Sequence, residues 1–310
     1  MESVYHIPAL LPQALDALDI HPGGVYIDCT FGGGGHSRAI VDRLDAQGHL
    51  YGFDQDRDAR ANAIDDPRFT FVLSNFRFLS NFMRFYGVDS VDGVLADLGV
   101  SFHHFDDEGR GFSFRFPEGP LDMRMNRAGR LTAAEVVNNY DVERLGRIFK
   151  LYGEMSQGPR IARAINKARS VKPIATTADL LAVVEPFINP RQYKKELAQL
   201  FQALRIEVND EIGALRAMLT QALAVLRPGG RLVVITYHSL EDRLVKNFMR
   251  TGNVDGKDER DFFGRSLAPM RLLTAKPVVA DEAEVLANPR SRAAKLRAAV
   301  KLKPPVQSNL

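Results

Sequence analysis

A run of four glycines at residues 32–35 constrains the fold of this 310-residue chain more than any other feature of its sequence. The run follows an apolar segment, residues 24–30, and precedes a helical pattern at residues 37–44. Glycines at such a junction let the backbone approach a ligand closely, and the first turn of a helix offers free N–H groups. The sequence therefore predicts a ligand site where a strand passes into a helix.

Further segments alternate between strand and helix patterns. A short helical stretch lies at residues 57–63, and apolar stretches typical of buried parallel strands recur at residues 49–54, 69–73, 91–98 and 231–237. This alternation predicts a doubly wound α/β sheet. In such a sheet the loops that follow the strands lie at one edge, where ligands bind.

The alternation stops near Asp106, and a long stretch with only helical patterns begins with Thr132 and Glu135 spaced as a capping box. We expect helices at residues 159–168, 177–185 and 191–204, and a longer one at residues 210–226 that returns to the sheet. The sequence thus predicts a sheet domain, residues 1–105 and 206–310, interrupted by a helical domain, residues 106–205.

Composition excludes several classes of protein. The 45% hydrophobic and 25% charged content is typical of a globular chain, and no apolar run is long enough to span a membrane. The first residues lack the basic start of a secretory signal, and the single Cys29 lies in no cluster with zinc-ligand spacing. We therefore expect a soluble, cytoplasmic protein without a metal site, whose oligomeric state the sequence leaves open.

Basic residues are concentrated at the end of the chain. Residues 286–310 contain six Lys/Arg and no Asp/Glu, although the whole chain carries a net charge of only +3. Such a segment is either a solvated tail or a contact surface for a polyanion, most economically a nucleic acid.

Asp54 ends the second predicted strand, 20 residues after Gly34. An acid at this place can accept hydrogen bonds from both ribose hydroxyls, which fits NAD and S-adenosylmethionine equally well. The dinucleotide fingerprint requires a third glycine where Ser37 stands, so a nicotinamide or flavin cofactor is disfavoured. A plain tight turn beside a surface carboxylate is the alternative interpretation.

Asp97 ends the fourth predicted strand, and an aromatic segment, residues 100–126, follows it. Arg110, Arg115 and Arg124 are interleaved there with phenylalanines at positions 102, 105, 112, 114 and 116. Exposed rings and guanidinium groups can stack unpaired bases and hold phosphates. Alternatively, the rings cover the junction between the sheet and the helical insert.

Seven motifs occur in a fixed order: DCTFGGGGHSR, DGVLADLGVS, DDEGRGFSFR, GPLDMRM, FQALRIEVNDE, LRPGGRLVVITYHSLEDRLVK and NPRSRAAKLR. With them the chain, from His6 to about Arg297, resembles the bacterial 16S ribosomal RNA cytosine-N4 methyltransferase family, called RsmH or MraW. The resemblance implies a Rossmann-like class I methyltransferase sheet with an inserted all-helical domain. It also implies S-adenosylmethionine as cofactor. The implied substrate is the exocyclic N4 amine of one cytidine in the decoding region of 16S rRNA, presented by the small ribosomal subunit.

Carried over motif by motif, the resemblance implies a set of cofactor contacts. These are Gly34, Gly35, His36, Asp54, Phe76 and Asp97. Two positions depart from the family pattern: His104 stands where a cofactor-contacting glutamine is usual, and Gly33 where an arginine is common. We expect His104 to take the place of the glutamine at the cofactor.

Methylation of a cytosine amine places its own demand on the site. The amine is a poor nucleophile because its lone pair is delocalised into the ring, so an acceptor must hold one N–H. Asp97 is the first candidate, with a contact to the methionine end of the cofactor as its alternative role. His238, Ser239 and Glu241 come next, although Ser239 and Glu241 also fit a helix start. No cysteine nucleophile is needed, in keeping with Cys29 inside a strand.

Substrate contacts are expected from three segments. In the aromatic segment they are Phe112, Arg115 and Arg124. One face of a predicted helix carries Arg160, Arg163 and Lys167, which form a basic strip with Arg169 and Lys172. This strip either binds phosphates or is a solvated helix face. Near the end of the chain they are Arg290 and Arg292, which with Lys295 and Arg297 belong to the last motif.

Three other functions remain open. A DNA amino-methyltransferase is disfavoured because that class usually carries a Pro-Pro-aromatic turn where this chain reads Asp97-Leu98-Gly99-Val100. A non-catalytic RNA-binding assembly factor on the same fold would not bind or turn over S-adenosylmethionine. A dehydrogenase is disfavoured by Ser37 and by the helical insert.

Overall fold

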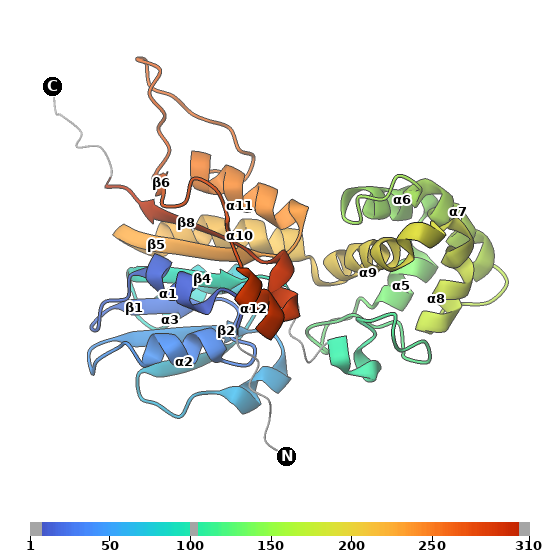
Figure 1. Cartoon of the computed structure of the whole chain (residues 1–310), viewed down its shortest axis with the longest axis horizontal. Coiled ribbons are helices and arrows are strands. Elements are labelled where there is room, and N and C mark those ends of the chain that lie inside the picture. The colour runs from blue at the N-terminus through green and yellow to red at the C-terminus, as the bar shows by residue number, and fades with distance from the viewer. Residues whose placement is uncertain (1–7, 100–104, 304–310) are drawn as a thin grey trace. The chain divides into compact units, whose positions relative to one another are not determined.

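The computed structural model describes residues 8–99 and 105–303. The chain divides into two compact units, which we call the sheet unit (Met1–Gly99 with Gly213–Leu310) and the helical unit (Val100–Ile212). The divisions expected from the sequence were residues 105/106 and 205/206. Figure 1 shows both units, with the sheet unit formed by the two ends of the chain.

Within the described residues, the sheet unit contains an eight-stranded sheet of order β3-β2-β1-β4-β5-β8-β6, in which β7 also pairs with β8. The strands from β3 to β5 are parallel neighbours, and β6, β7 and β8 are antiparallel additions. The strand bounds are β1 Val25–Asp28, β2 His49–Asp54, β3 Phe69–Leu73, β4 Val91–Asp97, β5 Leu226–Thr236, β6 Met270–Leu272, β7 Val278–Val279 and β8 Lys295–Lys301.

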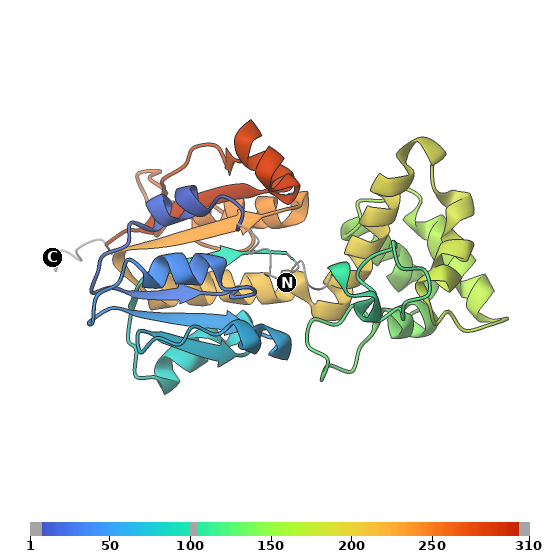
Figure 2. The ribbon, with the colours of Figure 1, turned by 60° about the horizontal axis from the view of Figure 1, so that its bottom comes forward.

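Helices cover both faces of this sheet, with α1 and α2 on one face and α10 and α11 on the other (Figures 1 and 2). The central strands are apolar on both faces, as expected for strands covered on both sides; Val94, Leu95 and Ala96 of β4 are fully buried. The bounds of the helices are α1 Leu11–Leu18, α2 Gly35–Val41, α3 Leu79–Phe85, α10 Glu211–Val225, α11 Ser239–Thr251 and α12 Glu282–Ala287. The predicted doubly wound α/β sheet is thus confirmed.

The basic C-terminal segment is not a solvated tail where the structure describes it. Strand β8 lies between β5 and β6, and its Leu296, Ala298 and Ala299 are buried. Its Arg297 is 6% exposed and donates two hydrogen bonds to the carboxylate of Asp242 on α11, at 2.7 and 3.1 Å. Arg297 therefore closes the sheet onto a helix and does not offer its charge to a polyanion.

The helical unit has a hydrophobic core of its own. Its helices are α5 Ala133–Asn139, α6 Val142–Leu151, α7 Gly158–Arg169, α8 Thr177–Val184 and α9 Tyr193–Asn209. Thr132 and Glu135 form the predicted capping box, and Thr176 with Asp179 forms a second one. Apolar faces of all five helices meet in one cluster, because each helix is amphipathic.

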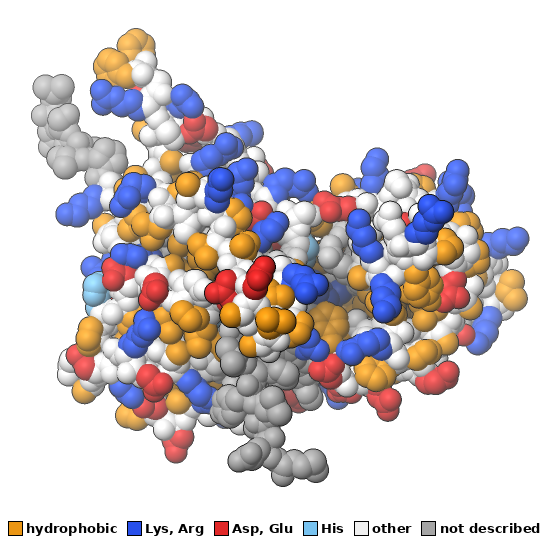
Figure 3. Space-filling view, in the orientation of Figure 1, with side chains coloured by type: hydrophobic (Ala, Val, Ile, Leu, Met, Phe, Trp, Pro, Cys, Tyr) orange, Lys and Arg blue, Asp and Glu red, His pale blue; other side chains and the backbone are white. Residues whose placement is uncertain are grey.

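Two details differ from the sequence analysis. The stretch at residues 57–63 is a 3-10 helix, η1 (Arg57–Asn62), whose N-cap is Asp56. Strand β5 begins at Leu226, before the Pro-Gly-Gly turn that was expected to precede it. Among the described helices, none combines the length and apolar character needed to cross a bilayer. Charged side chains are spread among hydrophobic ones on the face of both units drawn in Figure 3.

The Asp242–Arg297 pair gives a test of the packing of β8. Replacing Asp242 with alanine leaves the buried Arg297 guanidinium unpaired, so we expect the free energy of unfolding to fall by about 3 kcal/mol. The control is Arg216→Ala, which breaks an exposed pair with Asp255 and should cost less than about 1 kcal/mol. Urea denaturation measures both, and equal effects of the two variants would contradict a structural role for the buried pair.

Candidate active site

The glycine turn lies between β1 and α2, at the edge where the parallel strands end. Gly32 and Gly34 have positive φ angles of 51° and 77°, which only glycine adopts without strain. The turn is closed by the Gly34 amide, which donates to the carbonyl of Phe31 at 2.7 Å. Among the described residues, a Cβ at Gly33 would meet nothing within 4 Å, so the backbone at that point faces open space in this part of the structure.

Asp54, at the end of β2, is tied to the glycine turn. One carboxylate oxygen accepts the Gly32 amide at 2.9 Å, and the other accepts the Asp56 amide at 2.8 Å. These two bonds orient the carboxylate at the edge of the sheet. The half-buried Phe76 begins the 3-10 helix η2 (Phe76–Phe78), which is capped by Asn75 after the next strand.

Asp97, at the end of β4, is the centre of a polar network. The hydroxyl of Tyr237 donates to its Oδ1 at 2.8 Å, and Nδ1 of His36 lies 3.8 Å from its Oδ2. The Asp97 amide donates to Oγ1 of Thr30 at 2.7 Å. Residues from the ends of β1, β4 and β5 thus converge on one carboxylate, whose side chain is 21% exposed.

Burial controls ionisation in this network. Burial raises the pKa of Asp97 to about 6, although the His36 charge and the Tyr237 hydrogen bond act in the opposite direction. Burial, together with the neighbouring Asp97 charge, raises the pKa of Tyr237, so its hydroxyl remains a hydrogen-bond donor at every pH at which the protein is used. Asp97 can therefore take up and release a proton near neutral pH.

A second carboxylate, Asp28 at the end of β1, forms hydrogen bonds with residues on both sides of the glycine turn. It is 1% exposed, accepts the Ser37 hydroxyl at 2.6 Å, and accepts the Thr30 amide at 2.9 Å. His36 is also buried, and among the described residues its Nε2 has no hydrogen-bond partner. Because a buried polar atom is costly without a partner, this nitrogen fits a ligand contact.

The end of β5 forms a second polar cluster. His238, not Ser239, is the N-cap of α11, and Glu241 completes a capping box with it. The Glu241 carboxylate also accepts the Tyr237 amide at 3.0 Å and lies 3.1 Å from Nε2 of His238. Ser239 is exposed in the first turn of α11, so the alternative interpretation, in which Ser239 caps the helix, is wrong.

In the described part of the aromatic segment, two of the expected rings are packed inside the helical unit, and Phe102 lies outside the described residues. Phe112 is 3% exposed and belongs to the hydrophobic core of that unit, and Phe114 packs edge-on against Phe201 with centroids 5.7 Å apart. Phe112 is therefore a core residue and cannot stack an RNA base. Arg115 is held by Asp106 at 2.9 Å, although more than half of its side chain is exposed.

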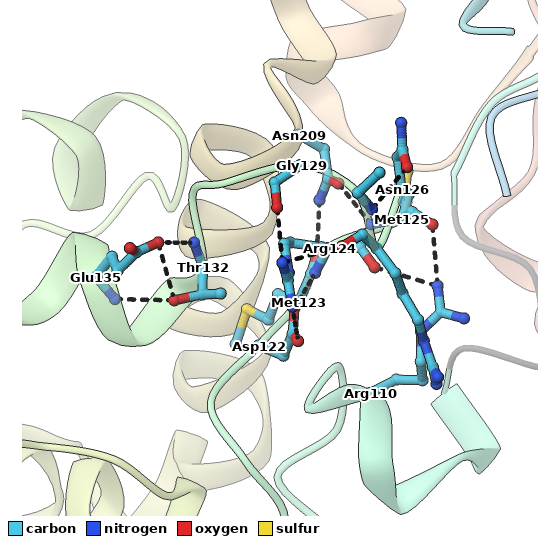
Figure 4. Close-up of polar contacts among 12 residues, drawn as sticks. Arg110, Asp122, Met123, Arg124, Met125, Asn126, Gly129, Thr132, Glu135 and Asn209 are labelled. Carbon is cyan, nitrogen blue, oxygen red and sulfur yellow. Dashed lines mark hydrogen bonds and ion pairs between the residues drawn. The ribbon is translucent and has the colours of Figure 1, made fainter.

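Arg124 is engaged within its own loop (Figure 4). Its guanidinium donates to both carboxylate oxygens of Asp122 and to the carbonyls of Arg127 and Gly129. The carbonyl of Arg124 in turn accepts from the buried Arg110 at 3.1 Å. These bonds close the loop and give Arg124 a structural role, while its contact with substrate stays a prediction.

Helix α7 retains only part of the expected basic strip. Arg160, Arg163 and Lys167 line a surface groove of about 540 Å³ whose floor is apolar, with Phe187 among its residues. Arg169 instead turns inward and donates to the carbonyl of Val137 at 2.7 Å. Lys172 is likewise paired, with Asp179 at 2.9 Å.

The remaining predicted contacts are more dispersed. Arg290 and Arg292 are exposed on the 3-10 helix η6 (Pro289–Ala293) of the sheet unit. His104 lies outside the described residues. Sequence reasoning missed Tyr237, Asp28 and Thr30; the signal for each is a polar residue at or just beyond the end of a predicted parallel strand.

The order of the parallel strands from β3 to β5, followed by the antiparallel β8, defines a Rossmann-like α/β fold. A model of the MraW methylase family matches residues 3–302, so the chain belongs to that family and is a methyltransferase. It is 60% identical over 300 residues to ribosomal RNA small subunit methyltransferase H of Phocaeicola vulgatus, covering 97% of this chain and 98% of that protein. It is 60% identical over 302 residues to the protein of the same name from Parabacteroides distasonis, covering 97% and 99%.

Ionisation of Asp97 lowers the free energy of unfolding of the protein. Because its pKa is higher in the folded state than in the unfolded chain, ionisation disfavours folding, and this cost grows as pH rises from about 4 to about 6. Asp97→Asn should match the wild type near pH 4 and exceed its unfolding free energy by up to about 3 kcal/mol above pH 6. Urea denaturation across this range measures the difference, and a difference independent of pH would contradict a raised pKa.

Proposed function

We propose that this methyltransferase transfers the methyl group of S-adenosylmethionine to the exocyclic N4 amine of one cytidine in the decoding region of 16S rRNA, within the small ribosomal subunit. The names of its relatives support an rRNA substrate of that subunit. The observation that carries the proposal is the Asp97 carboxylate, which lies at the ligand edge of the sheet with one oxygen held by Tyr237. Such a substrate places the enzyme in the cytoplasm.

The residues at the sheet edge fit S-adenosylmethionine. The open space at Gly33 and the positive φ angles beside it leave room against the backbone, and Nε2 of His36 is buried without a partner among the described residues. Asp54 is oriented by two amides at the end of β2, the place from which an acid contacts ribose hydroxyls in folds of this kind. We assign the cofactor to Gly34, Gly35, His36, Asp54, Phe76 and Asp97.

When bound, S-adenosylmethionine supplies a methyl group already activated by its sulfonium. The protein then has to hold the amine in line and accept one of its N–H hydrogens. Tyr237 occupies Oδ1 of Asp97, which leaves Oδ2 to accept that N–H and draw the nitrogen lone pair out of conjugation. With a pKa of about 6, Asp97 can take the released proton and return it to solvent. His238 and Glu241 are held in the α11 cap and serve to fix the Tyr237 backbone.

The helical unit supplies substrate contacts in this proposal. The target base must leave its stack to reach the amine site, so the flanking strand needs to be held by its phosphates. Arg160, Arg163 and Lys167 present three charges over the apolar floor of the α7 groove. Arg290 and Arg292 add two exposed charges on the sheet unit.

The reaction can be tested with labelled S-adenosylmethionine and small subunits that lack the modification, with naked 16S rRNA and duplex DNA in parallel. We expect label in N4-methylcytidine from the subunits. Asp97→Asn should lower kcat by about 10²- to 10⁴-fold, because the amide keeps the shape of the side chain but cannot take up the released proton. The control Cys29→Ala, which removes the buried thiol, should retain wild-type kcat because no cysteine adduct is formed.

Three outcomes would contradict the proposal. Label in a cytosine carbon would mean different chemistry, and label mainly in duplex DNA would make the enzyme a DNA amino-methyltransferase. Binding of the subunit with no transfer to any substrate would leave a non-catalytic RNA-binding factor.

A further inference from the structure

Helix α11 of the sheet unit carries an exposed cationic stripe that the proposed active site does not use. Arg243, Lys246 and Arg250 are exposed and lie three and seven positions apart, which places them on one face of the helix. Among the described residues, none of the three forms an ion pair closer than 4 Å. Arg250 is close enough to Asp258 of the following segment to help lower the pKa of that carboxylate, whereas Arg243 and Lys246 have no acid paired with them among the described residues.

The acids of α11 do not neutralise this stripe. Glu241 is 4% exposed and belongs to the helix cap, and Asp242 is bound by Arg297 of β8. Both carboxylates therefore interact with groups inside the sheet unit. The exposed face of the helix is left positively charged.

A segment with two exposed phenylalanines follows the stripe. The 253–267 hairpin joins α11 to β6, and its first turn contacts the helix, since a Cβ at Gly256 would lie 3.0 Å from Cβ of Asn247. Figure 3 shows hydrophobic side chains at the tip of this hairpin with Lys and Arg side chains beside them. Phe262 is 97% exposed and Phe263 is 78% exposed.

Hydrogen bonds hold the tip of the hairpin in shape. Oδ1 of Asp261 accepts the amides of Phe263 and Arg265 at 2.8 and 2.9 Å, and the Asp261 amide donates to the carbonyl of Arg265 at 2.9 Å. Asp258 accepts the Ser266 hydroxyl at 2.6 Å. A tip ordered in advance loses little conformational freedom when it binds.

The rings of the tip are arranged for contact with flat partners. Phe262 and Phe263 lie edge to face, with centroids 5.6 Å apart, and the Arg265 guanidinium lies 5.7 Å from the Phe263 centroid. The hairpin itself is not a cationic surface, because its Lys257, Arg260 and Arg265 are balanced by four acids, Asp255, Asp258, Glu259 and Asp261. Its contribution is aromatic, and the positive charge comes from α11.

We infer that α11 and the 253–267 hairpin form a second RNA-binding surface, in which Arg243, Lys246 and Arg250 hold phosphates and Phe262 and Phe263 stack on unpaired bases. The inference rests on the proposed RNA substrate. One RNA strand offers both phosphates and unpaired base faces along its length, so the stripe and the exposed rings that follow it in the chain can contact different nucleotides of the same strand. An apolar pocket of a protein partner would accommodate the rings but would leave the stripe unexplained.

Two matched double variants test the phosphate contacts. Arg243→Gln with Arg250→Gln removes two charges of the stripe, and the control Arg43→Gln with Arg84→Gln removes two exposed charges elsewhere on the sheet unit. The affinity of the full chain for unmodified small subunits is measured as a function of salt. We expect the stripe variant to bind about tenfold more weakly and to lower the slope of log Kd against log salt by about 2, because each phosphate contact contributes about 1. The control should match the wild type.

The rings are tested separately by fluorescence. The chain contains no tryptophan, so Phe263→Trp introduces a single indole at the tip. We expect saturable quenching of its emission by a single-stranded RNA oligonucleotide, and about tenfold weaker subunit binding by Phe262→Ala with Phe263→Ala. Quenching by subunits but not by RNA would indicate a ribosomal protein and overturn the inference, as would wild-type binding by the stripe variant.

The binding measurement does not depend on whether the protein transfers a methyl group. Binding is measured without methyl transfer, and transfer is followed in parallel at saturating subunit concentration, where the stripe variant should keep wild-type kcat. A wild-type protein that binds through the stripe but transfers no methyl group would contradict only the proposed function. A wild-type protein that transfers the group while the stripe variant keeps its affinity and salt slope would contradict only this inference.

Discussion

A largely buried carboxylate at the edge of a parallel sheet is the constraint on which the catalytic account depends. Asp97 ends β4, and the fold places Tyr237 from the end of β5, Thr30 from the loop after β1 and His36 from α2 around it. Burial keeps its pKa near 6, while the tyrosine fixes its orientation. The same arrangement that disfavours the charged form in the free protein prepares it to accept hydrogen from an amine.

The rest of the sheet unit holds this carboxylate in place. Asp28 and Asp54 tie the glycine turn to β1 and β2 through backbone amides, so the backbone that faces the cofactor side is rigid. Strand β8 pairs with β5 on the edge opposite β4, and its Arg297 binds Asp242 of α11. The capping box of α11 in turn sets the direction in which the chain leaves β5 after Tyr237.

The sheet, the glycine turn and the acids at the strand ends could be predicted because periodicity and glycine have direct backbone consequences. The exposure of individual phenylalanines could not be predicted, because the residue type alone does not distinguish a core position from a surface position. Phe112 is buried, whereas Phe262 is exposed. Strand β8 could not be predicted, because its basic residues indicate an exposed segment. Arg297 can be buried there only because Asp242, far away in the sequence, pairs with it. Hydrogen bonds across strands, such as that of Tyr237, likewise depend on distant segments.

The most direct test of the central claim is the pH dependence of single-turnover methyl transfer to unmodified small subunits, for the wild type and Tyr237→Phe. For the wild type, the rate should rise with pH through about 6, as Asp97 loses its proton. Loss of the tyrosine hydrogen bond removes a contact that lowers this pKa, so the rise should move to higher pH in the variant. A rate independent of pH in this range, or the same profile in both proteins, would contradict Asp97 as the acceptor.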